Sequence, residues 1–259
     1  MEGLFFETSP TTPYHFLDQA ELSVAPSNPQ VGLPYGGLDV ALGVQHLQML
    51  GVKYYLAFSP AVIAQADRNP SLVPIATSRH WPAPGVTWHV YLIRRSAMVT
   101  ALSTLPNVVR NISSRTQWLN ANVTWWLHPD LWTVVGAASG PGDWPRASSI
   151  SSMSAQSIAP TTVSDVRVAA QSLSFHVTRL GAPVLVKVSY YPRWHATGAS
   201  GPYRVSPNLM VVVPTAHDVT LTYGSSPPVV VGNLISDATV LGGVVALWFA
   251  LRRRRVARR

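Results

Sequence analysis

The sequence contains no cysteine, which excludes disulfide bonds, thiolate metal sites and a cysteine nucleophile. Charged residues make up only 12% of the chain and apolar residues 47%, so the charged share is about half that of a typical soluble domain. Lysine is rare as well, with Lys53 and Lys187 as its two occurrences among 19 basic residues. This composition directs attention to long apolar stretches.

Sequence motifs of common enzyme classes are also missing. The chain has no glycine-rich phosphate loop, no G-x-S-x-G, no H-E-x-x-H and no EF-hand loop. Its eight histidines are spread singly, and no two of them share one expected helix at i, i+4 spacing. Carboxylates are scarce, and nothing selects a pair for glycoside hydrolysis. We therefore predict no catalytic residue, no metal site and no cofactor for this chain alone.

An apolar stretch of 23 residues, Val229 to Leu251, lies close to the C-terminus and contains one acid, Asp237. As a helix it would be about 34 Å long, enough to cross a hydrocarbon core of about 30 Å. Trp248 lies where an interfacial aromatic belt is expected. The stretch is followed at once by Arg252, Arg253, Arg254 and Arg255. We predict a single transmembrane helix over 229–251 and a basic cytoplasmic tail over 252–259, because basic clusters stay on the cytoplasmic side.

The alternative is a buried helix of a soluble protein, since the polar residues Asn233, Ser236, Asp237 and Thr239 interrupt the first half of the stretch. We favour the span, because these residues gather near its outer end, where water and headgroups reach. The chain is then expected in a bacterial cell membrane, with the lipid bilayer as partner and the bulk of the chain extracytoplasmic.

The net charge of +8 results largely from the six arginines that follow Leu251, and residues 1–228 carry only +3. Nucleic acid is therefore not an expected partner. The first residues lack the basic and apolar regions of a signal peptide. If residues 1–228 lie outside the cytoplasm, an upstream segment has to translocate them. We expect this chain to be the C-terminal piece of a larger polytopic protein; the alternative is post-translational insertion that leaves residues 1–228 inside.

The order of the expected elements predicts an α+β fold. Residues 1–37 are rich in turn formers and are expected to be mostly irregular. Alternating helices and strands then complete a small α/β unit over 1–80. Its elements are a helix over 38–50, a strand over 53–58, a helix from Pro60 to about Arg68 and a strand over 72–77.

Residues 81–138 are expected to be a β-rich segment joined to the next unit, with a strand over 88–94 and short aromatic strands over 122–127 and 131–135. A Ser/Pro/Gly-rich loop is expected over 139–160. Residues 161–226 show strands at regular spacing, which is typical of an antiparallel β-sandwich. The strands are expected over 163–169, 172–178, 183–191, 203–214 and 218–223.

Aromatic and basic residues are densest in Ser189-Tyr-Tyr-Pro-Arg-Trp-His-Ala-Thr-Gly198 and in the following Pro202-Tyr-Arg204. An aromatic face covers the C–H side of a sugar, and polar groups around it bond the hydroxyls. The stretch therefore predicts a carbohydrate-binding platform; the alternative is that its aromatic side chains fill the core at a strand end. The candidate residues are Tyr190, Tyr191, Arg193, Trp194 and Tyr203.

Three segments share a further pattern: HLQMLGVKYYLAFSP (46–60), PVLVKVSYYPRWHATGASGPYRVSPNLMVVVP (183–214) and DVTLTYGSSP (218–227). A leucine-gly-val-x-tyr strand, a tyr-x-pro-x-trp turn and a closing span resemble the C-terminal extracytoplasmic region of large bacterial polytopic membrane proteins. These are the YfhO-like and 6-pyruvoyl-tetrahydropterin-synthase-related membrane proteins, which are similar to GT-C glycosyltransferases. The resemblance implies that the catalytic carboxylate lies in an early loop that this chain does not contain.

The leading hypothesis is thus a membrane-anchored extracytoplasmic module of a glycosyltransferase-like protein of the cell envelope, which binds or positions an envelope glycan or a lipid-linked sugar. The second hypothesis is a non-catalytic assembly module, which packs against upstream membrane spans or a partner membrane protein. In that case Asn233 and Asp237 are expected to bond a partner helix.

Overall fold

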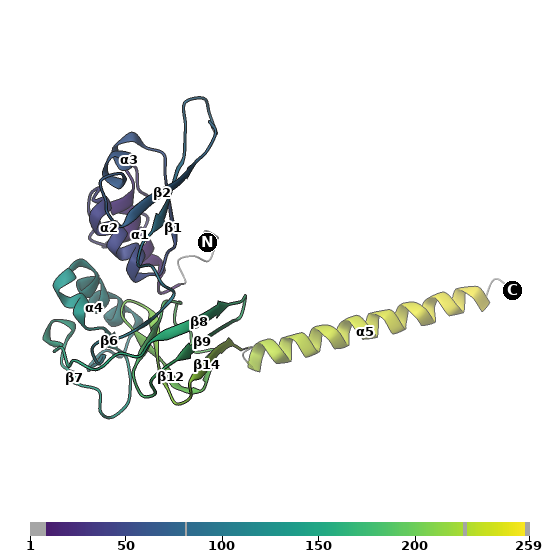
Figure 1. The fold of residues 1–259 in the computed structure, drawn as a ribbon. Helices are drawn as coiled ribbons and strands as arrows, with labels where there is room; N and C mark the ends of the chain where they lie inside the picture. The colour runs from purple at the N-terminus through teal and green to yellow at the C-terminus, as the bar shows by residue number, and fades with distance from the viewer. Residues whose placement is uncertain (1–8, 81, 225–226, 257–259) are drawn as a thin grey trace.

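The computed structural model of the protein describes residues 9–80, 82–224 and 227–256, and within the last range it describes the side-chain surroundings of residues 230–245 and 248. The fold is mixed α+β with largely antiparallel sheets, as predicted. Figure 1 shows an N-terminal unit, a larger β-rich unit and helix α5, which extends away from both.

The N-terminal unit is built on a three-stranded antiparallel sheet in the order β1 (Tyr54–Ala57), β3 (His89–Ile93), β2 (Leu72–Thr77). Helices α2 (Val40–Met49) and α3 (Pro60–Ala66) pack against one face of this sheet in a common apolar core. The predicted helix over 38–50 and the three strands over 53–58, 72–77 and 88–94 are confirmed. Because β3 pairs with both β1 and β2, the predicted boundary at residue 80 falls inside this sheet.

The other face of the sheet carries exposed apolar side chains. Tyr55 and Ala57 of β1 point into the core, whereas the alternate residues Tyr54, Leu56 and Phe58 are 47%, 52% and 50% exposed. Ile75 of β2 is also 50% exposed. An alternating strand normally shows polar residues to water, so this apolar surface is unusual.

The expectation of an irregular N-terminal segment is wrong, because residues 12–22 form helix α1 (Thr12–Leu22). Its buried residues include Tyr14, Leu17, Asp18 and Glu21, which follow one helical face. Two of these four are acids, so the buried face does not read as apolar in the sequence. Pro13, near the helix start, fits a first turn that needs no main-chain N–H donor.

The larger unit contains two sheets that share one apolar core. A seven-stranded sheet has the order β4-β10-β13-β12-β6-β5-β7, and a four-stranded antiparallel sheet has the order β11-β14-β9-β8. Within the seven-stranded sheet, β5 pairs in parallel with β6 and β7. The strands are β4 (Val99–Ala101), β5 (Asn107–Val109), β6 (Gly136–Ala137), β7 (Arg146–Ala147), β8 (Val163–Val168), β9 (Ser172–Val177), β10 (Val184–Val186), β11 (Trp194–Thr197), β12 (Ala199–Val205), β13 (Leu209–Pro214) and β14 (Asp218–Tyr223).

Strand β13 is buried on both faces, which makes the seven-stranded sheet a middle layer. Met210 and Val212 pack toward β9 and β14 of the four-stranded sheet. Leu209 and Val211 pack on the opposite side, in a second core that includes Trp125 of helix α4 (Arg115–Leu127). Helix α4 therefore packs on the face of the seven-stranded sheet that lies opposite the four-stranded sheet.

The prediction of aromatic strands over 122–127 and 131–135 is wrong. Residues 115–127 form α4, and a 3-10 helix, Pro129–Thr133, follows. Ser114 and Gln117 cap α4 reciprocally, since Ser114 Oγ accepts from the Gln117 N–H at 3.1 Å and Gln117 Oε1 accepts from the Ser114 N–H at 3.1 Å. The aromatic residues Trp118, Trp125 and Trp126 lie on the buried side of this helix.

Two further expectations change in detail. The predicted strand over 203–214 is a hairpin, in which β12 and β13 pair around a turn at Ser206-Pro207-Asn208. The predicted loop over 139–160 contains the short strand β7 and a 3-10 helix, Ile150–Ser152. The predicted strands over 163–169, 172–178 and 218–223 are confirmed as β8, β9 and β14.

Helix α5 (Pro227–Val256) contains the whole of the predicted span, 229–251. Among the helices of the described residues, none combines the length and the apolar content that crossing a bilayer requires. Asp237 and Asn233 are exposed polar residues within the helix, while the surroundings of Val229 and Leu251 lie outside the described residues. The predicted span is therefore not supported by the structure and stays a prediction.

Lys187 connects the two units at the C-terminal end of α2. Its Nζ donates a hydrogen bond of 2.7 Å to the main-chain oxygen of Gln48, where the negative end of the helix dipole favours a cation. Burial nevertheless lowers the pKa of Lys187 from 10.5 to about 8. The unfolded chain therefore binds more protons than the folded chain between these pH values.

We predict that the contribution of Lys187 to the free energy of unfolding rises as the pH increases from about 8 to 10.5. Replacing Lys187→Met should remove this rise. The free energy of unfolding of the wild type should then increase relative to that of the variant by on the order of 2 kcal/mol across this pH range, a value that already allows for partial solvent screening. Denaturant unfolding of the intact chain in detergent, followed by tryptophan fluorescence, measures the difference. The control is Lys53→Met, which removes the other, exposed lysine; an equal change in both variants would contradict the assignment.

Candidate binding pocket

The predicted aromatic platform forms only in part. Three of its residues gather around Tyr223, the last residue of β14: the Arg193 guanidinium lies 4.7 Å from the centre of the Tyr223 ring, and the Trp194 ring lies 5.3 Å from it, edge-on. Tyr191 also meets Tyr223 edge-on, at 6.5 Å. These side chains pack on one another at the edge of the four-stranded sheet.

The other two candidates lie apart from this group. Tyr203 packs edge-on against Trp144, with ring centres 5.2 Å apart, and belongs to the core beneath β12. Tyr190 packs against the core between the two sheets, and its N–H donates to the Asn208 carbonyl at 2.8 Å. For Tyr190 and Tyr203 the structure places the side chains in core packing, which was the alternative interpretation.

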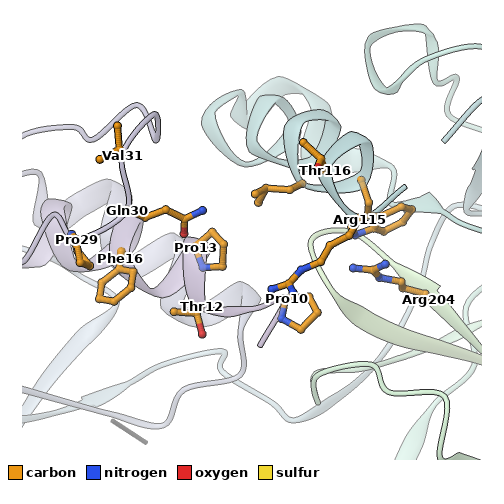
Figure 2. A pocket seen from close by; sticks show the side chains of 12 residues that line it. Pro10, Thr12, Pro13, Phe16, Pro29, Gln30, Val31, Arg115, Thr116 and Arg204 are labelled. Atoms are coloured by element: carbon orange, nitrogen blue, oxygen red, sulfur yellow. The ribbon is translucent and has the colours of Figure 1, made fainter. Parts of the chain in front are cut away.

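A cavity of about 500 Å³ lies between the start of α1, the loop at residues 29–31, the first turns of α4 and strand β12. Figure 2 shows Arg115 and Arg204 reaching into this space from α4 and β12, with Pro10 and Pro13 opposite. Apart from Arg115 and Arg204, the described residues that line it are neutral: Pro10, Thr12, Pro13, Phe16, Pro29, Gln30, Val31, Thr116, Trp118 and Leu119. None of the five residues of the predicted platform lines it.

Arg204 is held in one position by two contacts. Its Nε donates to Asn208 Oδ1 at 2.8 Å, and its guanidinium stacks on the Trp118 ring at 4.6 Å from the ring centre. Trp118 is itself fixed, because its Nε1 donates to the Pro207 carbonyl at 2.8 Å. The turn between β12 and β13 therefore fixes both the arginine and the ring beneath it.

The same arginine carries an unused donor. Its Nη2 is buried and has no hydrogen-bond partner within the described residues. Burial lowers the pKa of Arg204; Tyr14 and Tyr190 oppose this shift, and the nearby positive charge of Arg115 adds to it. A guanidinium nonetheless stays protonated in proteins. A buried cationic donor beside a second arginine needs an acceptor, and an anion entering the cavity would supply one.

The position of α4 adds to this preference for an anion. Arg115 and Thr116 are the first two residues of the helix, so the cavity lies beside its N-terminal end, where the helix dipole is positive. Hydroxyl and amide groups of Thr12, Thr116 and Gln30 stand around the same space and suit a polar, hydroxylated ligand. No carboxylate or histidine lines the described part of the cavity, so Arg115 and Arg204 are its charged groups there.

The membrane and topology residues of the sequence prediction fall on α5. Asp237 and Trp248 are exposed. The side chains of Val229, Leu251, Arg252, Arg253, Arg254 and Arg255 lie outside those whose surroundings the structure describes.

The cavity residues did not stand out in the sequence, because they come from four separate segments. One signal was available: Ser114-Arg-Thr-Gln117 has the S-x-x-Q spacing of a capping box and marks the start of a helix. That signal would have placed Arg115 in a first helical turn. Nothing in the sequence indicates that Arg204 faces the same space.

Comparisons of the chain with protein-family models, with curated proteins and with solved structures find no match.

Proposed function

We propose that this chain is a membrane-anchored, extracytoplasmic binding module that holds an anionic glycan or lipid-linked sugar phosphate in the cavity between α1 and α4. The observation that carries the proposal is the buried Nη2 of Arg204, which has no acceptor among the described residues, on a side chain that lines a cavity of about 500 Å³. A phosphate or carboxylate oxygen would complete its hydrogen bonds.

The other residues that line the cavity suit a sugar that bears the anionic group. Neutral polar groups of Gln30 and Thr116 face the same space as the two arginines, and such groups bond sugar hydroxyls. The volume is within the usual range for small-molecule sites. The proposed site differs from the platform predicted at Tyr190, Tyr191, Arg193, Trp194 and Tyr203, none of which lines the cavity.

Titration calorimetry on the intact chain in a neutral detergent tests this site with glucose 1-phosphate, glucuronate and glucose. We expect binding of the two anions and none of glucose. Arg204→Gln and, separately, Arg115→Gln should each lower the affinity about 10- to 100-fold, because each removes a charge-assisted hydrogen bond. The control is Arg110→Gln, which changes an exposed arginine outside the cavity. Equal binding of glucose, or equal losses in all three variants, would overturn the assignment.

We propose further that α5 anchors the chain in a bacterial cell membrane, with its arginines in the cytoplasm. All side chains described between residues 230 and 245 are exposed, and many of them are large and apolar. Burying such side chains in lipid is worth roughly 1.5–3 kcal/mol each. The complete apolar stretch in the sequence, 229–251, is longer than the part whose surroundings the structure describes.

A fluorescent protein fused after Arg259 reports the location of the C-terminus in intact bacterial cells. We expect fluorescence, retention in the membrane fraction after alkaline carbonate washing, and protection from protease added to spheroplasts. Replacing Arg252, Arg253, Arg254 and Arg255 by glutamine should weaken this orientation. A reporter that protease reaches from outside, or an intact chain that stays in solution without detergent, would refute the anchor.

A second candidate function, an assembly module, is favoured by the open face of the β1-β3-β2 sheet. Phe58 packs on Trp88 there, with ring centres 4.7 Å apart, beside the exposed Tyr54 and Leu56. An apolar patch of this kind on a structured sheet is typical of a protein interface. The partner expected is an upstream membrane span or another membrane protein.

The absence of cysteine makes this candidate easy to test, because Leu56→Cys introduces a unique thiol. If a partner covers the sheet, a maleimide should label this thiol at least several-fold more slowly in native membranes than in the purified chain. Gln45→Cys, on the exposed side of α2, should react equally in both. Equal labelling of Leu56→Cys in membranes and after purification would exclude a covering partner.

A further inference from the structure

Three ionisable side chains lie together in the interior where α1 and α2 meet α4. Asp18 and Glu21 come from neighbouring turns of α1, and His46 comes from α2; their exposed fractions are 4%, 4% and 0%. One oxygen of each carboxylate and one ring nitrogen of His46 lie within 4.8 Å of one another. Burying two adjacent carboxylates costs free energy unless a positive charge is shared with them.

The orientation of His46 is fixed by its other nitrogen. Nε2 lies 3.1 Å from the main-chain oxygen of Trp126, and since a carbonyl only accepts, Nε2 carries the hydrogen. Nδ1 is thereby turned to Glu21, at 2.7 Å from Oε2. The ring also stacks on Trp126, with centres 3.8 Å apart and planes at 7°. Metal-bound histidines are held in the same way, with the second nitrogen donating to a carbonyl.

Asp18 supplies an independent sign that a partner is missing. Its Oδ1 is buried and makes no hydrogen bond to any residue that the structure describes. Either a proton or a metal ion has to balance the charge of this site.

We propose that Asp18, Glu21 and His46 bind a divalent transition-metal ion of the Zn²⁺ class, which ties α1 to α2. Two carboxylates and one imidazole suit such an ion, whereas Ca²⁺ and Mg²⁺ prefer oxygen ligands alone. Three protein ligands leave one position for water. Tetrahedral bonds of about 2.0–2.1 Å keep ligand atoms about 3.3 Å apart, so Glu21 and His46 separate slightly when the ion enters.

The role that follows is structural. The ion lies on the side of α1 that faces α2, away from the lining residues Thr12 and Phe16, and it needs no ligand in the cavity. The site was not predicted from the sequence for two reasons. It contains a single histidine, and its ligands come from two helices, of which α1 was not expected. This inference is independent of the proposed sugar binding.

The test uses the intact, untagged chain in detergent, stripped with EDTA and dialysed against Zn²⁺, Mn²⁺, Ca²⁺ or Mg²⁺ in separate samples. We expect one retained Zn²⁺ per chain by elemental analysis. At a free Zn²⁺ concentration about 100-fold above the dissociation constant, the unfolding temperature should rise by about 5–10 °C. Mn²⁺ should act less strongly, and Ca²⁺ and Mg²⁺ should have no effect.

Asp18→Asn and His46→Gln should each abolish both the retained Zn²⁺ and the rise in unfolding temperature. The matched control is His176→Gln, because His176 forms the other His–carboxylate pair found in the described residues, an exposed contact of 2.9 Å to Asp218. If either cluster variant fails to fold, the wild-type stoichiometry decides. No retained metal and no shift in wild type would overturn the proposal in favour of a shared proton. Equal retention by wild type and Asp18→Asn would overturn it in favour of metal held elsewhere.

Discussion

The contact of His46 and Tyr14 with Trp126 is the constraint on which the arrangement of the molecule depends. His46 stacks on Trp126 from α2, and Tyr14 of α1 lies 5.4 Å from the same ring. The N-terminal unit is thereby fixed against α4, and α4 in turn rests on the seven-stranded sheet. Since α1 forms one wall of the cavity and α4 another, the shape of the cavity depends on how the two units pack at their joint, the contact of α1 and α2 with α4.

Charged and polar groups are buried mainly along this joint. Lys187 reaches α2 from the sheet, Arg204 lies under the start of α4, and Asp18, Glu21 and His46 meet beside Trp126. Burying these charged groups costs free energy, whereas burying apolar residues at the same positions would not. The hydrogen bonds of Lys187 to Gln48 and of His46 to Trp126 form in only one arrangement, so these two residues select the relative orientation of the two units.

The sequence was a good guide wherever one face of an element was apolar and the other polar. The helix after Asp39 and strands β9 and β14 follow their local patterns, and both strands alternate between buried and more exposed residues. It failed where the buried side was not apolar or where aromatics suggested strands: α1 buries two acids, and α4 buries three tryptophans at helical spacing. The cavity could not be predicted, because Arg115 and Arg204 meet only through the packing of α4 on β12.

Two apolar surfaces stay uncovered in the described structure, and they differ in the partner each requires. The exposed side chains of α5 surround a helix whose main-chain groups are bonded internally, so lipid can cover them without any matching shape. The open face of the β1-β3-β2 sheet is different, because it carries Tyr54, which has a hydroxyl, among its exposed apolar groups. Covering it requires a partner with a complementary surface and a hydrogen-bond acceptor. Lipid alone would therefore suit the helix but not the sheet, so the proposed membrane attachment and the proposed protein partner are independent of each other.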